Sequence, residues 1–147
     1  MPQNKLILLV EDDEADAVLM HRLIRILYED SEEYVITVER CDHGGEALAR
    51  LIRPDGQLQH PIPDLVMLDL RMPVLDGFDV LAAMKSQDKT RRVPIVVLST
   101  SDADGDITRA YKLGTNGYLV KPVRANTFRH MVSAAGSFWL EANLVPR

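Results

Sequence analysis

Apolar residues follow two patterns along this chain. Residues 6–10, 65–70 and 94–99 are short, nearly continuous apolar runs. Runs of this length predict strands that are buried on both faces, as in parallel sheets. Two further strands are predicted at residues 34–40, which are rich in β-branched side chains, and at the short segment 118–120.

Between these runs, apolar residues recur at helical spacing. Helices are predicted over residues 15–29, 44–52, 78–85, 104–113 and 126–142. Residues 53–63 contain three prolines and one glycine and are predicted to form a surface loop. Strand and helix therefore alternate, which indicates an α/β fold with a doubly wound five-stranded parallel sheet and five helices.

Composition narrows the class of protein. At 147 residues the chain fits one domain over residues 1–147, with 140–147 as a C-terminal tail. The net charge of −5 argues against direct nucleic-acid binding, and the single cysteine excludes an internal disulfide. The first apolar run is too short for a signal peptide or a membrane span. We therefore expect a cytoplasmic protein with no membrane contact.

Polar residues that can carry chemistry follow four of the predicted strands. Asp12 and Asp13 follow the first, Asp69 lies near the end of the third, and Ser99 and Lys121 end the last two. The carboxyl ends of parallel strands share one edge of the sheet, so these groups should converge.

The convergence of these groups has an electrostatic cost. Two like charges ~4 Å apart repel by roughly 4 kcal/mol at an effective dielectric constant near 20, so carboxylates at this edge need a shared proton or a cation. An oxygen-only ligand set with few protein ligands favours Mg²⁺ over Ca²⁺. Beside such a cation and a lysine, Asp69 could act as a nucleophile on a phosphoryl group and form an acyl phosphate. Taken singly, each residue also has a plain structural explanation as a helix start, a strand cap or a surface charge.

Four segments in order resemble the receiver domain of two-component response regulators. They are Glu11-Asp12-Asp13, the stretch 68–77 (LDLRMPVLDG), Leu98-Ser99-Thr100-Ser101 and Gly117-Tyr118-Leu119-Val120-Lys121-Pro122. The resemblance implies a flavodoxin-like sheet of order 2-1-3-4-5. It also implies that Asp69 accepts phosphate from a sensor histidine kinase, without further enzyme activity beyond slow self-dephosphorylation.

The same resemblance assigns roles to individual residues. Asp13 and Asp69 would ligate Mg²⁺ through their side chains, Arg71 through its backbone carbonyl and Asp12 through water. Ser99 and Lys121 would bind the phosphoryl group, with Ser99 and Tyr118 as the switch pair. The Lys121–Pro122 bond would be cis. Thr100 departs from the small residue usual at its position, which could slow hydrolysis or transfer of the phosphoryl group.

The C-terminal region resembles a narrower group. The long loop 53–63 and the apolar tail are similar to response regulators coupled to bacterial phytochromes. No output domain is expected after the fifth helix, so the output would be partner binding, phosphorelay or self-association. Four apolar residues near the C-terminus are predicted to form a patch that supports a homodimer: Phe138, Leu140, Leu144 and Val145. The alternative is that the tail folds back over the loop.

Two other functions remain open at this point. One is a Mg²⁺-dependent phosphohydrolase resembling the haloacid dehalogenase group, although Arg71 stands where that group has a second acid. The other is an interaction module that keeps the receiver fold but does not use phosphate.

Overall fold

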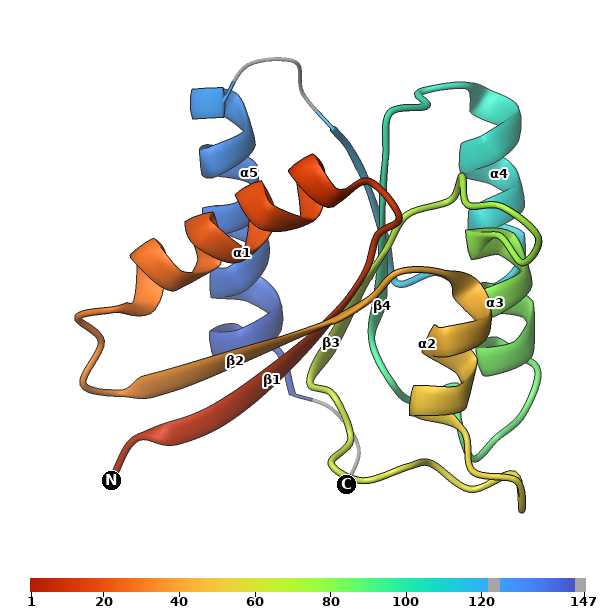
Figure 1. Ribbon diagram of the computed structural model, residues 1–147, viewed down its shortest axis with the longest axis horizontal. Helices are drawn as coiled ribbons and strands as arrows, with labels where there is room; N and C mark the ends of the chain where they lie inside the picture. The colour runs from red at the N-terminus through yellow and green to blue at the C-terminus, as the bar shows by residue number, and fades with distance from the viewer. Residues whose placement is uncertain (122–124, 145–147) are drawn as a thin grey trace.

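The computed structural model of the chain describes residues 1–121 and 125–144. Its centre is a parallel sheet of five strands in the order β2-β1-β3-β4-β5 (Figure 1). The strands are β1 (Gln3–Val10), β2 (Tyr34–Cys41), β3 (Leu65–Leu68), β4 (Ile95–Ser99) and β5 (Gly117–Val120). The helices are α1 (Glu14–Tyr28), α2 (Gly44–Leu51), α3 (Gly77–Lys85), α4 (Asp104–Lys112), α5 (Ala125–Gly136) and a π-helical segment, η1 (Ser137–Ala142). The predicted doubly wound fold and its strand order are confirmed.

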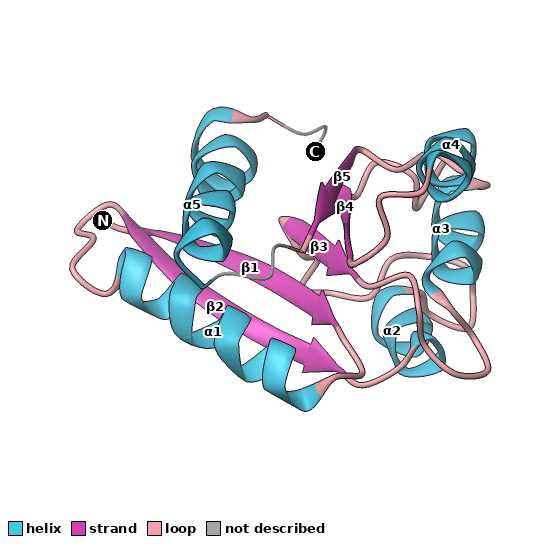
Figure 2. Cartoon of the chain, turned by 90° about the horizontal axis from the view of Figure 1, so that it is seen from above, coloured by secondary structure: helices cyan, strands magenta, loops and turns pink. Residues whose placement is uncertain are grey.

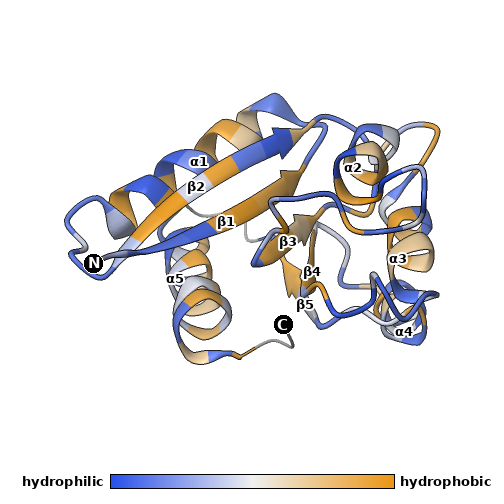
Figure 3. Cartoon of the chain, turned by 90° about the horizontal axis from the view of Figure 1, so that it is seen from below, coloured by the Kyte–Doolittle hydropathy of each residue, from blue (hydrophilic) through white to orange (hydrophobic). Residues whose placement is uncertain are grey.

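Helices cover both faces of the sheet (Figure 2). On one face, α1 and α5 bury Met20, Ile24 and Val132 against the sheet. On the other face, α2 and α3 bury Leu51, Leu81 and other apolar side chains. The central strands β3 and β4 between these layers are apolar (Figure 3) and buried along their whole length, as strands covered on both faces require.

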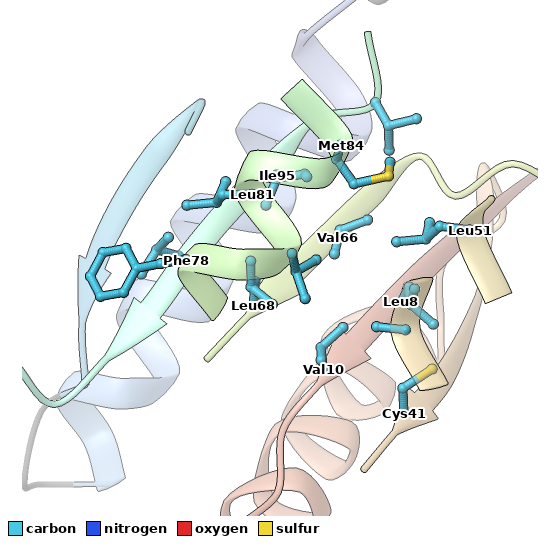
Figure 4. Packing of buried hydrophobic residues seen from close by; sticks show 14 of the residues in the cluster. Leu8, Val10, Cys41, Leu51, Val66, Leu68, Phe78, Leu81, Met84 and Ile95 are labelled. Atoms are coloured by element: carbon cyan, nitrogen blue, oxygen red, sulfur yellow. The ribbon is translucent and has the colours of Figure 1, made fainter. Parts of the chain in front are cut away.

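The cluster below α2 and α3 shows how these layers pack. Figure 4 shows Leu81 and Met84 of α3 lying over Val66 and Ile95 of the sheet. All four side chains are fully buried. Burying a side chain of this size contributes about 1.5–3 kcal/mol, so these contacts stabilise the packing of α3 on β3 and β4.

The start of α3 lies very close to the end of β3. Asp76 and Asp79 form a capping box, in which each side chain accepts a hydrogen bond from the other residue's backbone N–H at 3.0 Å. A Cβ at Gly77 would overlap the carbonyl oxygen of Asp69. Glycine is therefore required there, and it allows the helix to begin directly beside Asp69.

The third strand and the loop 53–63 differ from what the sequence predicts. Strand β3 ends at Leu68, so Asp69 follows the strand instead of lying inside it. Its N–H still donates to the Val10 carbonyl at 2.9 Å, which continues the sheet pairing by one residue. In the loop 53–63, Leu58 is buried in the core and forms an isolated antiparallel bridge with Ile52, so the loop is partly anchored and not wholly a surface segment.

The C-terminal helix also departs from the prediction. The α-helix ends at Gly136, and a π-helical segment follows in which the Asn143 N–H donates to the Phe138 carbonyl at 2.7 Å. The wider turn of a π-helix rotates the side chains relative to an α-helix. Leu140, expected in an exposed patch, is buried with 1% of its surface exposed. Phe138 and Leu144 are exposed, at 52% and 92%.

The π-helical segment is tied to the first helix, because the Tyr28 hydroxyl of α1 donates to Glu141 at 3.0 Å. Val145 lies outside the described residues. No helix in the described ranges is both long and apolar enough to cross a bilayer.

Candidate functional site

Three carboxylates meet at the carboxyl edge of the sheet. Glu11, Asp12 and Asp69 each place one oxygen within 4.8 Å of the other two. The strand register explains this arrangement: Val10 of β1 pairs with Leu68 of β3, so the next residues of both strands lie side by side. We call these three residues the acidic group.

Asp13, for which the resemblance implies a Mg²⁺-ligand role, does not belong to the acidic group. Its side chain caps α1 by accepting a hydrogen bond from the Asp16 N–H at 2.9 Å. Glu11 is instead the buried acid at the end of β1, and its side chain is only 3% exposed. The sequence did contain a signal for this shift. Glu11 is the first residue after the apolar run of β1, as Asp69 is the first after the β3 strand.

Lys121 is the cation of the site. Its ammonium nitrogen lies 2.9 Å from Glu11, 3.0 Å from Asp16 and 3.9 Å from Asp69, and its side chain is 8% exposed. Its backbone N–H donates to the Ser99 carbonyl at 2.7 Å. Lys121 therefore joins the end of β4 to the acidic group. The predicted cis bond to Pro122 lies outside the described residues.

Burial changes the proton affinity of these groups. Desolvation raises the pKa of Glu11 to about 7, although the hydrogen bond from Lys121 acts in the opposite direction. Desolvation also raises the pKa of Asp69 to about 6, opposed by the charge of Lys121 and by a hydrogen bond from the Arg71 backbone. For Lys121, burial lowers the pKa, but the bond to Glu11 and the charge of Asp69 outweigh it and raise the pKa overall.

A second network begins at Ser99 and leads away from the acidic group. Ser99 is fully buried, and its hydroxyl oxygen accepts from the Ser101 N–H at 3.1 Å. The Tyr118 hydroxyl donates to the Ser101 carbonyl at 2.8 Å. The Ser101 hydroxyl donates to Asp106 of α4 at 2.7 Å, and Arg71 donates to the same oxygen at 2.6 Å. We call these last four residues, Arg71, Ser101, Asp106 and Tyr118, the α4 network.

The α4 network joins the loops after β3 and β4 to the first turn of α4 and to β5. Arg71 follows β3, Ser101 follows β4 and Asp106 lies in the first turn of α4. Arg71 stands two residues beyond Asp69, so any movement of the loop after β3 also moves the ion pair with α4. The predicted strand ends placed Ser99 at this edge, and the resemblance implied Tyr118 as its switch partner. Neither gave a sign of the contact between Arg71 and Asp106.

The donor set of the acidic group fits a hard divalent cation. Carboxylate oxygens are the ligands that Mg²⁺ and similar ions prefer, with water completing the coordination. Three acids so close together also need positive charge, and Lys121 reaches Glu11 most closely of the three. Asp12 is exposed and leaves the group open to solvent on one side.

A family profile for the response regulator receiver domain matches residues 7–133. The chain belongs to the receiver domain family. Response regulator Rcp1 of Synechocystis sp. is 35% identical over 143 residues, covering 97% of this chain and 93% of that protein. This receiver is therefore assigned to a family of signalling modules and not to the phosphohydrolases considered from the sequence.

Solved structures support the same assignment. The phosphorylated cyanobacterial phytochrome response regulator RcpA matches with a TM-score of 0.82 and 36% identity, covering 99% of this chain and 100% of that chain. The Mn²⁺-bound form of response regulator Rcp1 matches with a TM-score of 0.78 and 36% identity, covering 97% and 99%. The receiver is thus similar over nearly its whole length to response regulators that include phytochrome-linked ones.

Proposed function

We propose that this receiver is a cytoplasmic response regulator that accepts a phosphoryl group on Asp69 from a histidine kinase. The observation that carries the proposal is the position of Asp69, whose carboxylate lies beside the acids at the end of β1 and 3.9 Å from the ammonium of Lys121. A carboxylate at this position can act as a nucleophile, and the neighbouring ammonium can stabilise the negative charge of an added phosphoryl group.

Mg²⁺ would be held by the acidic group, with the Arg71 backbone carbonyl as a further ligand. Bound there, it would neutralise charge on the phosphoryl oxygens. Asp13 is left out of this ligand set because its side chain already caps α1. The Mn²⁺-bound form of the similar Rcp1 supports a divalent cation in this family.

In the proposed transfer, a carboxylate oxygen of Asp69 attacks the phosphorus of a phosphohistidine. An O–P bond forms as the P–N bond breaks, and the electron pair of that bond stays on the imidazole nitrogen. Lys121 then turns from Glu11 toward the phosphoryl oxygens, and the Ser99 hydroxyl donates to one of them. Later attack by water returns Asp69 slowly to its free form, and Thr100 narrows the approach to the site.

The readout would pass through the α4 network. When the Ser99 hydroxyl turns toward the phosphoryl group, it no longer accepts from the Ser101 N–H. Ser101 holds both Tyr118 and Asp106, so the tyrosine ring and the first turn of α4 are released together. Such a change is a shift between two packed arrangements, biased by local charge.

Labelling with acetyl phosphate tests the main proposal. The parent should take up one acid-labile phosphoryl group in the presence of Mg²⁺, and Asp69→Asn should take up none while keeping its fold. Asp88→Asn, at an exposed acid in the loop after α3, serves as the control and should label fully. A parent that is not labelled would support the interaction module that does not use phosphate.

The kinase partner is proposed to be a phytochrome. The similarity to phytochrome response regulator RcpA over 99% of this chain supports this. Phosphotransfer from a purified cyanobacterial phytochrome kinase should be at least about tenfold faster than from an unrelated histidine kinase, a difference of ~1.4 kcal/mol in activation free energy. Equal rates from both kinases would remove the basis for phytochrome coupling.

A symmetric homodimer is proposed for the C-terminal side of the molecule. Phe138 and Leu144 are exposed there, and Val120 of the edge strand β5 is 39% exposed. Phe138→Ser should weaken dimerisation in sedimentation velocity, with and without a phosphoryl mimic. The control is Val35→Ser, which removes an exposed apolar side chain from the opposite edge strand, β2. A parent that stays monomeric at tens of micromolar, about −6 to −7 kcal/mol in affinity, would contradict the dimer.

A further inference from the structure

A cavity of about 300 Å³ lies at the amino edge of the sheet, and no part of the proposed phosphoacceptor chemistry uses it. Two loops line it, one between α2 and β3 and one between α3 and β4. Figure 1 shows both loops at the same side of the molecule, away from the loops that follow β1 and β3. The lining residues, which we call the basic pocket, are Arg53, Gln57, Leu58, His60, Lys89 and Arg92.

The first wall of the basic pocket is held by backbone hydrogen bonds. The Arg53 N–H donates to the Gln57 carbonyl at 2.8 Å, and the Gly56 N–H donates back to Arg53 at 2.9 Å, closing a tight turn. Leu58 is buried beneath this turn and anchors it to the core. The turn therefore has a defined shape before any ligand arrives.

The second wall is held by two buried or half-buried side chains. The Thr90 hydroxyl donates to the Met84 carbonyl at 2.6 Å. The Lys85 ammonium donates to the carbonyls of Arg91 and Val93 at 2.8 and 2.7 Å. These bonds fix the segment that carries Lys89 and Arg92, so less conformational entropy is lost when an anion binds.

The charge of the basic pocket is opposite to that of the whole chain. Three permanent cations line it in a protein of net charge −5, and no lining residue is acidic. Arg53 is paired with Asp55 at 3.1 Å. Among the described residues, Lys89 and Arg92 have no carboxylate partner, because Asp88 pairs with Arg91 instead. Two cations are thus left to face the cavity.

The residue types indicate phosphate as the ligand group. Arginine presents a planar set of donors that matches phosphate oxygens, and lysine adds a mobile point charge. His60 and Gln57 each add a hydrogen-bond donor at the rim. The volume lies at the lower end of the range of small-molecule pockets, and one phosphate ion would leave much of it to water. We propose that the basic pocket binds the diphosphate group of a small anion.

This site is separate from the acidic group. The two lie at opposite ends of the parallel strands, and no residue belongs to both. Binding can therefore be measured in EDTA without divalent cations, where the acidic group repels anions. If no anion bound to the basic pocket in this experiment, the proposed phosphorylation of Asp69 would still stand, because it uses different residues.

Calorimetric titration of the full chain with pyrophosphate, ADP and inorganic phosphate tests the proposal. At about 20 mM salt, where exposed charges are weakly screened, pyrophosphate and ADP should saturate one site. Inorganic phosphate should bind at least about tenfold more weakly, or ~1.4 kcal/mol. Equal affinity for pyrophosphate and ADP would identify the diphosphate group alone as the ligand; tighter ADP binding would identify a nucleoside-borne diphosphate.

Variants locate the binding. The double variant Lys89→Ala/Arg92→Ala should bind pyrophosphate at least about tenfold more weakly than the parent. The matched control, Arg22→Ala/Arg25→Ala, removes two cations from α1 and should bind like the parent. Backbone amide shifts in the parent should change at residues 53–60 and 89–92 on titration. The proposal would be overturned if both double variants lost affinity equally, or if neither diphosphate probe showed saturable binding. It would also be overturned if the amide shifts changed only at residues outside 53–60 and 89–92.

Discussion

The two edges of the sheet handle charge in contrasting ways. At the carboxyl edge, Lys121 and Glu11 are almost fully buried and lie 2.9 Å apart. At the amino edge, Lys89 and Arg92 are exposed to solvent around an open cavity. Buried charges depend on one another for their stability, whereas exposed ones are stabilised by water. An added charge at the carboxyl edge should therefore change the pairing of the buried groups. An anion at the amino edge should bind or leave without changing the pairing of buried charges.

Removing one cation from each edge should show the largest difference. Lys121→Met would leave Glu11 and Asp69 buried without a counter-charge, at a cost of about 3 kcal/mol in unfolding free energy near pH 8. Lys89→Met, at the exposed edge, should stay within about 0.5 kcal/mol of the parent. Urea denaturation measures both.

The same pair of variants has an internal check. Lowering the pH to 5.5 should reduce the cost of Lys121→Met, because Glu11 and Asp69 then take up protons. Adding Glu11→Gln to Lys121→Met should recover part of the loss. If the two lysine variants were equally stable, the buried ion pair would not have the importance assigned to it.

Mg²⁺ should bind at the carboxyl edge and not at the amino edge. At millimolar concentration it should raise the unfolding free energy of the protein by about 1–3 kcal/mol, because it binds the folded acidic group and not the unfolded chain. Asp12→Ala should abolish the Mg²⁺-dependent rise in Tm. Asp13→Ala should lower Tm, because loss of the α1 cap costs about 1 kcal/mol of unfolding free energy. It should keep the Mg²⁺-dependent rise in Tm. Loss of the rise in Asp13→Ala alone would restore the ligand set implied by the resemblance.

The different roles of Asp12 and Asp13 could not be predicted from the sequence, although much of the fold could. The apolar runs predicted β1, β3 and β4, because a strand buried on both faces needs nearly uninterrupted apolar residues. The edge strands β2 and β5 are less buried, and they were predicted from β-branched residues and from a short apolar segment. The same reasoning brought Asp69, Ser99 and Lys121 to one edge. It did not decide which of three consecutive acids points inward, since that depends on the register of β1 against β3.

Contacts between distant loops were also beyond the sequence. The ion pair between Arg71 and Asp106 depends on how α4 docks, and the basic pocket depends on two loops that meet only in the folded chain. The net charge of −5 argued only against nucleic-acid binding and gave no sign of a local group of cations. Leu140 was misplaced because the change from α- to π-helix has no plain signature in residues 137–142.

The pH dependence of stability should be the next largest effect. The pKa of Glu11 is raised from 4.5 to about 7 in the folded protein. Its stabilising contribution is therefore complete below pH 4.5 and is lost as the pH rises through 7. Without Mg²⁺, the unfolding free energy of the parent relative to Glu11→Gln should fall by on the order of 1–2 kcal/mol between pH 5 and pH 8.

Mg²⁺ reverses the sign of this dependence, since the cation competes with the proton and binds better as the pH rises. Melts of the parent and Glu11→Gln at pH 5, 6.5 and 8, in EDTA and in Mg²⁺, measure both trends. A parent whose stability relative to Glu11→Gln does not change with pH in EDTA would show that Lys121 keeps Glu11 ionised throughout.

The smallest change in stability should come from the α4 network. Arg71 is 61% exposed, so Arg71→Ala should cost less than about 1 kcal/mol in unfolding free energy. The hydrogen bonds from Ser101 and Arg71 hold the pKa of Asp106 below its usual range, which keeps that carboxylate ionised at the start of α4. Without Arg71, Asp106 and Ser101 stay bonded, but the loop after β3 loses its tie to the helix. A phosphoryl mimic at Asp69 should then still shift the amides of residues 99–101, while its effect on residues 104–107 shrinks by at least half. Lys112→Ala, at the far end of α4, should leave both responses at the parent level. If Arg71→Ala transmitted the full shift to α4, the signal would run through Ser101 alone, and Arg71 would contribute only surface charge.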